Sequence, residues 1–121
     1  MKAFVFAAAL GATASAGVAA EAHAVLRTGN PAPAAVVKTA PKTLRLQFNE
    51  ALIGKFTSLE VVGPDGRPLH AGPVTVDRKN KAVVTAPLHG AGAPGVYTVK
   101  WNAATGDMHK MQGSYTFTVR P

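Results

Sequence analysis

The sequence GVYTVKW at residues 95–101 alternates side chains of two kinds, and GSYTFTV at residues 113–119 does the same. One face of each run is apolar: Tyr97, Val99 and Trp101 in the first, and Tyr115, Phe117 and Val119 in the second. Alternation with a period of two is typical of a β-strand that buries one face in a core. The two runs therefore predict two half-buried strands in the second half of the chain.

Runs of the same type occur upstream. TLRLQF at residues 43–48 alternates leucine and phenylalanine with polar residues, and further strands are predicted at residues 23–28, 56–62, 73–76 and 81–86. The turn sequences GPDG and DRKN, at residues 63–66 and 77–80, separate neighbouring runs. No segment has the period of a helix. About seven short strands with regular turns predict one all-β domain, an antiparallel sandwich or barrel.

The composition is that of a single globular domain without cysteine chemistry. The chain has 121 residues, of which 47% are hydrophobic and 16% are charged, a mixture too apolar for intrinsic disorder. It has no cysteine, which excludes disulfides, thiolate zinc sites, iron–sulfur clusters and a cysteine nucleophile. Any metal must therefore be bound by histidine, carboxylate, methionine or backbone groups.

The chain is basic, with a formal net charge of +7, and this charge favours anionic surfaces. The lysines and arginines are nevertheless dispersed, and the one cluster, Arg78-Lys79 with Lys81, falls in a predicted hairpin loop. The aromatic residues that could stack on bases lie on the predicted core faces. We therefore expect no nucleic acid partner.

Residues 1–22 have the features of a secretory signal peptide. A lysine at the second position supplies the positive charge, AFVFAAAL at residues 3–10 forms the apolar part, and Ala20 and Ala22 are the small residues before a cleavage site. A membrane anchor is the alternative, but the apolar part is short for a span. The expected organisation is a signal peptide at residues 1–22 and one exported domain at residues 23–121.

The position of cleavage decides which residue begins the mature chain. Cleavage after Ala22 leaves His23 first, whereas two other possible cuts would leave Glu21 or Val25 first. An N-terminal histidine offers its α-amine and its imidazole Nδ1 to one metal ion, and both groups lose protons near neutral pH. Two nitrogens in a tetragonal arrangement suit Cu(II).

The sequence Asp107-Met108-His109 offers a second pair of ligands. In an extended segment, residues two apart project to the same side, so the carboxylate and the imidazole can approach one metal while Met108 points away. Together with an N-terminal histidine they would form a set of three nitrogens and one oxygen, which suits Cu(II). His70 and His89 lie in turn-like sequences, where we expect ordinary solvated side chains.

A combination of these motifs resembles the CopC family of periplasmic copper-resistance and copper-carrier proteins. The motifs are His23-Ala24 after a signal peptide, Leu46-x-Phe48-x-Glu50, Leu59-x-Val61, Gly66, Tyr97-x-Val99-x-Trp101, Asp107-x-His109 and Gly113-x-Tyr115-x-Phe117-x-Val119. The resemblance covers nearly the whole mature chain. It implies a seven-stranded Greek-key β-sandwich or barrel, immunoglobulin-like or cupredoxin-like in outline.

The resemblance also implies a high-affinity site for one Cu(II) ion per chain. Its ligands would be the amine and imidazole of His23, the carboxylate of Asp107 and the imidazole of His109. Glu50 matches an acidic position of the family and is either a partner that orients a ligand or an ordinary carboxylate at a strand end.

The chain departs from one branch of this family, whose members carry a methionine-rich segment for Cu(I). The corresponding residues 49–56 contain no methionine, and only Met108 and Met111 remain after the signal peptide. Cu(I) needs soft thioether ligands, so the resemblance favours the members that bind Cu(II) only.

The function implied is that of a periplasmic, monomeric and non-enzymatic Cu(II) carrier or sequestering protein. Its delivery partner would be an inner-membrane copper transporter of the CopD type. Two alternatives remain open at this point: a copper monooxygenase with a histidine brace, and a metal-free β-sandwich module for assembly or adhesion.

Overall fold

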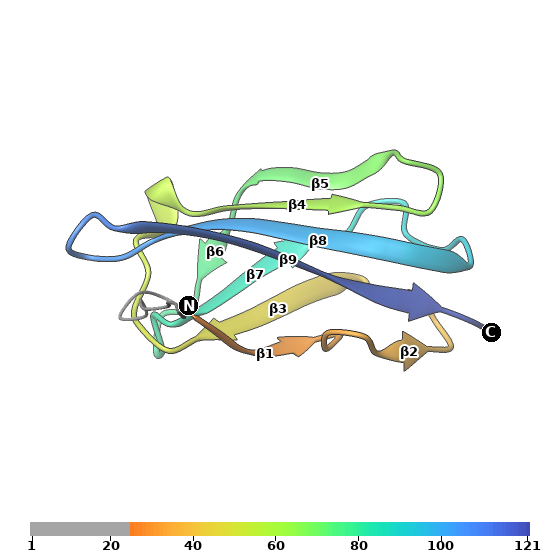
Figure 1. Ribbon diagram of the computed structural model, residues 1–121, viewed down its shortest axis with the longest axis horizontal. Helices are drawn as coiled ribbons and strands as arrows, with labels where there is room; N and C mark the ends of the chain where they lie inside the picture. The colour runs from red at the N-terminus through yellow and green to blue at the C-terminus, as the bar shows by residue number, and fades with distance from the viewer. Residues whose placement is uncertain (1–24) are drawn as a thin grey trace, which may run out of the picture.

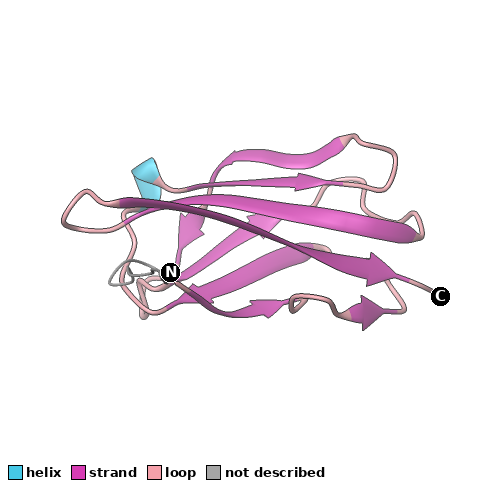
Figure 2. Cartoon of the chain, viewed as in Figure 1, coloured by secondary structure: helices cyan, strands magenta, loops and turns pink. Residues whose placement is uncertain are grey.

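The structure, a computed structural model, describes residues 25–121 and forms a two-layered β-sandwich (Figures 1 and 2). One sheet has the strand order β1-β3-β7-β6 and the other β2-β9-β8-β4-β5. The strands of the first sheet are β1 (Leu26–Asn30), β3 (Thr43–Phe48), β7 (Val83–Pro87) and β6 (Thr75–Val76). Those of the second are β2 (Val36–Val37), β9 (Lys110–Val119), β8 (Gly95–Ala104), β4 (Ser58–Val62) and β5 (Pro68–Pro73). All pairs are antiparallel except β2 with β9.

The core lies between the sheets and consists of the alternating apolar residues of the sequence pattern. Its largest fully buried side chains are Tyr97, Phe48, Phe117, Leu44, Leu46 and Leu59. The rings of Tyr97 and Phe117 stack with centroids 5.0 Å apart. The Tyr97 hydroxyl donates to the carbonyl of Ala93 at 2.6 Å and accepts from the Gly92 amide. Its polar tip is therefore satisfied, as a buried tyrosine requires.

The predicted all-β sandwich is confirmed, and residues 25–121 contain nine strands where about seven were expected. Residues 68–72, which the sequence predicts as turn or loop, form most of strand β5, which begins and ends in proline and contains Gly72. Pro73, predicted to start the next strand, is its last residue. Strand β5 lies at the edge of its sheet, where proline is tolerated because its missing N–H faces away from the ladder. Strand β2 has two residues and pairs with β9, too short a run to show alternation.

Most of the predicted strand boundaries also shift. The 3₁₀ turn η1 (Gly54–Phe56) occupies the start of the run predicted at residues 56–62. Strands β8 and β9 extend beyond their predicted ends and pair as far as Ala104 with Lys110. Ala103 and Ala104 are fully buried there, but alanine carries little strand signal. Residues 1–22, predicted as a signal peptide, and His23 lie outside the described residues.

Trp101 is the only tryptophan and fills the space above a glycine of the neighbouring strand. It pairs with Gly113 across β8 and β9, and its ring meets those of Phe48 and Tyr115 at centroid distances of 5.8 and 6.1 Å. A Cβ atom on Gly113 would lie 2.2 Å from Trp101 Cζ2. Trp101 closes this part of the core, and its side chain therefore fits only opposite a glycine.

Gly113→Ala should therefore destabilise the fold by roughly 1–3 kcal/mol, because the added methyl displaces a packed ring. Gly92→Ala is the matched control, since a Cβ there meets nothing within 4 Å and should change stability by less than about 0.5 kcal/mol. Urea denaturation of the two variants and the parent measures both effects. Equal midpoints for Gly113→Ala and the parent would show that the ring relaxes freely.

Candidate metal centre

The loop between β8 and β9, residues 105–109, brings two candidate ligands together. The Thr105 amide donates to the carbonyl of His109 at 3.1 Å, and the Met108 amide donates to the carbonyl of Thr105 at 2.9 Å. Met108 has a φ of 68°, in the left-handed region that non-glycine residues rarely adopt. The loop is thus a tight, internally hydrogen-bonded turn.

Within this turn, Asp107 and His109 are in direct contact. The Asp107 Oδ2 lies 2.8 Å from His109 Nδ1, and the two side chains are 63% and 57% exposed. The sequence predicted that these side chains would meet, and they do. The local reason was wrong, because the segment is a turn with Met108 in the left-handed region and not an extended strand. The pair offers one carboxylate and one imidazole at an exposed position, as a metal site requires.

Thr105 fixes the position of the Asp107 carboxylate through a hydrogen bond. It is one of the few buried polar residues of residues 25–121, with 2% of its surface exposed. Its hydroxyl donates to Asp107 Oδ1. This hydrogen bond is the largest cause of a pKa of Asp107 that is lowered to about 2. Desolvation is the next largest effect and opposes it, while the hydrogen bonds and the charge of His109 lower the pKa further. The carboxylate is therefore ionised throughout the range in which a metal would bind.

The sign of this shift also fixes how the turn responds to acid. A lowered pKa stabilises the folded state above the ordinary carboxyl pKa of about 3.9, and the contribution is lost as the pH falls towards 2. Because the side chain is exposed, the local turn should be the part affected.

Thr105→Val should raise the pKa of Asp107 from about 2 towards its ordinary value of about 3.9. Valine keeps the shape and β-branching of threonine and removes the hydroxyl donor, whereas Thr105→Ser keeps the donor and serves as the control. The measurement is an NMR titration of the Asp107 carboxyl carbon in the metal-free protein. A pKa that remains near 2 in the valine variant would assign the shift to His109 instead.

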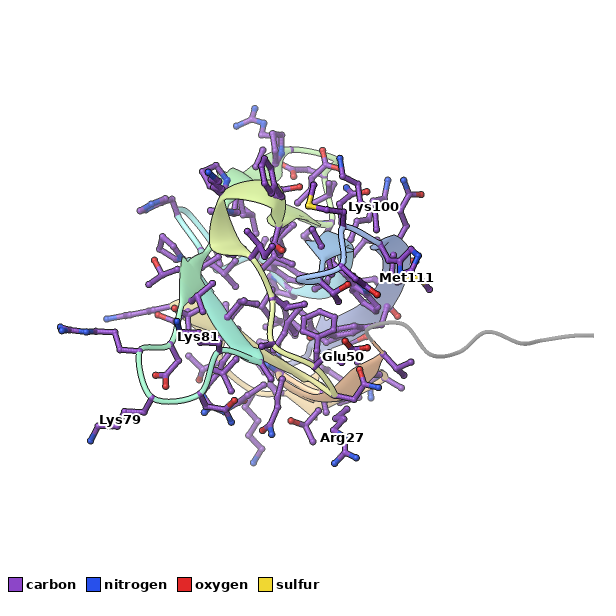
Figure 3. The ribbon with its side chains drawn as sticks, turned by 90° about the vertical axis from the view of Figure 1, so that its left-hand side faces the viewer. Arg27, Glu50, Lys79, Lys81, Lys100 and Met111 are labelled. Atoms are coloured by element: carbon purple, nitrogen blue, oxygen red, sulfur yellow. The ribbon has the colours of Figure 1, made fainter. Side chains whose placement is uncertain are left out.

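The first described residue lies at the same end of the sandwich as this loop. The Val25 amide donates to Asn49 Oδ1 at 2.7 Å, and the Asn49 amide donates to the Val25 carbonyl at 3.0 Å. Leu52, a little further along, forms a β-bridge with Thr105. The segment after β3 therefore connects the start of β1 to the β8–β9 loop. Figure 3 looks onto this end of the molecule, with the half-buried Glu50 and Met111 labelled there.

The other two described histidines, His70 and His89, take no part in this arrangement. His70 was predicted in a turn but lies in strand β5, opposite Val61, with its Nε2 3.2 Å from the carbonyl of Pro73. His89 is exposed and its amide donates to the carbonyl of Leu69. Within residues 25–121 no three metal-binding side chains gather at one place. Asp107 and His109 are therefore the two candidate ligands that the structure brings into contact within this part of the chain.

Asp107 and His109 were predictable from the sequence as candidate ligands, whereas Thr105 and Asn49 were not. Neither residue carries a signal by itself, because threonine and asparagine are common at the ends of strands. Only the long-range bridge between Leu52 and Thr105 shows that they belong to one end of the fold. No helix in residues 25–121 is long and apolar enough to span a membrane.

Comparisons with known proteins agree with the fold and with the predicted family. Residues 26–120 match the model of the CopC domain. The chain is 33% identical over 99 residues to protein YobA of Escherichia coli K12, covering 82% of this chain and 80% of that one. It is 34% identical over 106 residues to copper resistance protein C of Escherichia coli, covering 82% of each chain.

A solved structure shows the same architecture. The crystal structure of CopC from Methylosinus trichosporium OB3b superimposes with a TM-score of 0.75 at 25% identity, over 82% of this chain and 95% of that one. The domain match spans almost every residue that the structure describes, so the chain belongs to the CopC domain family.

Proposed function

We propose that this protein is a periplasmic Cu(II)-binding protein that carries or sequesters copper. The observation that supports this most is the Asp107–His109 pair, 2.8 Å apart and exposed, at the end of the sandwich where the described chain begins. The names of its relatives, such as copper resistance protein C, support copper as the cargo. One Cu(II) per chain would be held by the amine and imidazole of His23, the carboxylate of Asp107 and the imidazole of His109.

The position of Val25 supports a contribution from His23. Val25 is fixed by two hydrogen bonds to Asn49. A residue two places earlier can lie no further than about 7 Å from it, since each residue spans at most about 3.6 Å. An N-terminal His23 would therefore be confined to the end of the fold that carries the β8–β9 loop. This is the geometric condition for an amine–imidazole chelate to share a metal with Asp107 and His109.

The ligand types favour Cu(II) over Cu(I). Nitrogen and carboxylate donors in a tetragonal arrangement suit Cu(II), whereas Cu(I) requires thioethers or thiolates. Residues 49–56 contain no methionine. Met108 is 58% exposed on the loop, and Met111 lies on β9. The mature chain therefore offers at most two thioether ligands for Cu(I). Glu50, half-buried at the same end, would be the partner that orients a ligand.

A carrier is favoured over an oxygen-activating enzyme by Asp107. A carboxylate that is a fourth ligand occupies a position that dioxygen would need, and it is already ionised and held by Thr105. The protein would act as a monomer in the periplasm after removal of residues 1–22 and would exchange copper with an inner-membrane transporter of the CopD type.

Native mass spectrometry of the exported protein, with and without one equivalent of Cu(II), tests this function. We expect a chain that begins at His23 and retains one copper ion. A chain that begins at Glu21 or Val25, or one that takes up no copper, would remove the terminal chelate and overturn the proposal.

A further inference from the structure

A groove beside the candidate metal loop is a large concave feature that the proposed function leaves unexplained. Its volume is about 690 Å³, and it lies between residues 51–55, the corner from β5 to β6, the β6–β7 hairpin and Gly106. Half-buried apolar side chains line it: Ile53, Val74 and Val76. Gly54 closes one wall so tightly that a Cβ there would lie 2.8 Å from Val76 Cγ2. The groove therefore has apolar walls and is open to solvent.

Cationic side chains surround this groove. Lys55, Arg78 and Lys81 line it and are exposed, and none of them forms a salt bridge within residues 25–121. Figure 3 shows Lys79 projecting from the hairpin at this end of the molecule, where Lys81 is also labelled. The one acidic residue in the lining, Asp77, accepts hydrogen bonds from the amides of Lys79 and Asn80. Its carboxylate is therefore directed into the hairpin turn, and the rim is net positive.

The groove is physically continuous with the candidate metal loop. Gly106 lines it and immediately precedes Asp107, and the neighbouring Leu52 is bridged to Thr105. A molecule in the groove would therefore lie against the loop that presents Asp107 and His109. Positive charge at this place repels a free metal cation and attracts a negatively charged macromolecule. The charge is unfavourable for capturing Cu(II) from solution and favourable for exchanging it with an acidic partner.

We infer that this groove docks an acidic protein segment that also carries apolar side chains, so that copper passes between the two proteins at the adjoining loop. To match the apolar lining, the docking segment must place apolar side chains in the groove. To match the positive rim, it must carry carboxylates beside those side chains. A flat anionic membrane matches the positive charge of the rim, but its surface cannot fill a concave groove. That the segment exchanges copper rests on the proposed function, whereas the docking itself does not.

The docking is tested with a synthetic heptapeptide that alternates glutamate and leucine and is blocked at both ends. We expect amide shifts in ¹H–¹⁵N spectra to cluster at Ile53, Lys55, Val76 and Gly106. The double variant Lys55→Glu/Lys81→Glu should weaken binding by about tenfold or more, because two attractive charges become repulsive. Lys38→Glu/Lys42→Glu is the matched control: it makes the same change in net charge at exposed residues that do not line the groove. A peptide with glutamine in place of glutamate should bind more weakly as well.

Three results would overturn this inference: equal affinity of the two double variants, shifts that cluster elsewhere, or binding to phosphatidylglycerol vesicles without binding to the peptide. The titration is done on metal-free protein and repeated on His109→Ala, which leaves the groove unchanged. If the parent protein takes up no Cu(II) but binds the peptide at the groove, the proposed function fails and the docking surface stands. If it binds Cu(II) but not the peptide, only the docking surface fails.

Discussion

A mature chain that carries one additional residue ahead of His23 should bind Cu(II) far more weakly than the chain that begins at His23. The extension converts the α-amine into an amide, which no longer chelates the metal together with the His23 imidazole. Loss of a residue that only hydrogen-bonds to a metal ligand already lowers the affinity for the metal by roughly 10–100-fold. Loss of a direct ligand together with its chelate ring should therefore cost at least about a hundredfold.

The measurement is a competition titration against a Cu(II) chelator of known affinity, with electron paramagnetic resonance to count nitrogen ligands. The matched control carries the same additional residue after Pro121, which is exposed and follows β9. It should bind as the parent does. Unchanged affinity in the chain extended before His23 would exclude the terminal chelate, whatever the family match implies.

The fold was predictable because its largest strands carry the strongest alternation. In β3 the inner residues are apolar and the outer ones polar, and in β8 the inner Tyr97 and Val99 alternate with Thr98 and Lys100. Each of these strands therefore shows its period without reference to its neighbours. Strand β5 could not be found in this way, because proline and glycine are poor strand formers and its pairing depends on β4. Two-residue β2 is likewise created by its partner β9.

The candidate metal centre was predictable to the extent that its residues are close in sequence. Asp107 and His109 are two residues apart, and any compact loop brings such side chains together. Their support by Thr105 and the place of Val25 beside Asn49 depend on contacts between distant segments. These contacts are set by the packing of the two sheets and leave no local pattern. The same holds for the groove, whose walls come from four separate segments.

Cu(II) should raise the melting temperature strongly, since the proposed site ties the start of the chain to the β8–β9 loop. A ligand that binds only the folded state adds about 4 kcal/mol of stability when its free concentration is a thousand times the dissociation constant. In a domain of about a hundred residues this corresponds to an increase of more than about 10 °C. Calorimetry or circular dichroism is the suitable measurement, because Cu(II) can quench the fluorescence of Trp101.

His109→Ala separates this linkage from non-specific copper binding. The side chain is 57% exposed, so the variant without metal should melt within a few degrees of the parent. With the imidazole removed, Cu(II) should lose most of its stabilising effect, and Asp107→Asn should reduce it in the same direction. A similar increase in the parent and in His109→Ala would mean that copper is bound elsewhere, with His70 and His89 the histidines then left to test. Because the two variants change exposed atoms of one turn, a loss of copper-dependent stability in both would assign the metal to this loop and not to the fold in general.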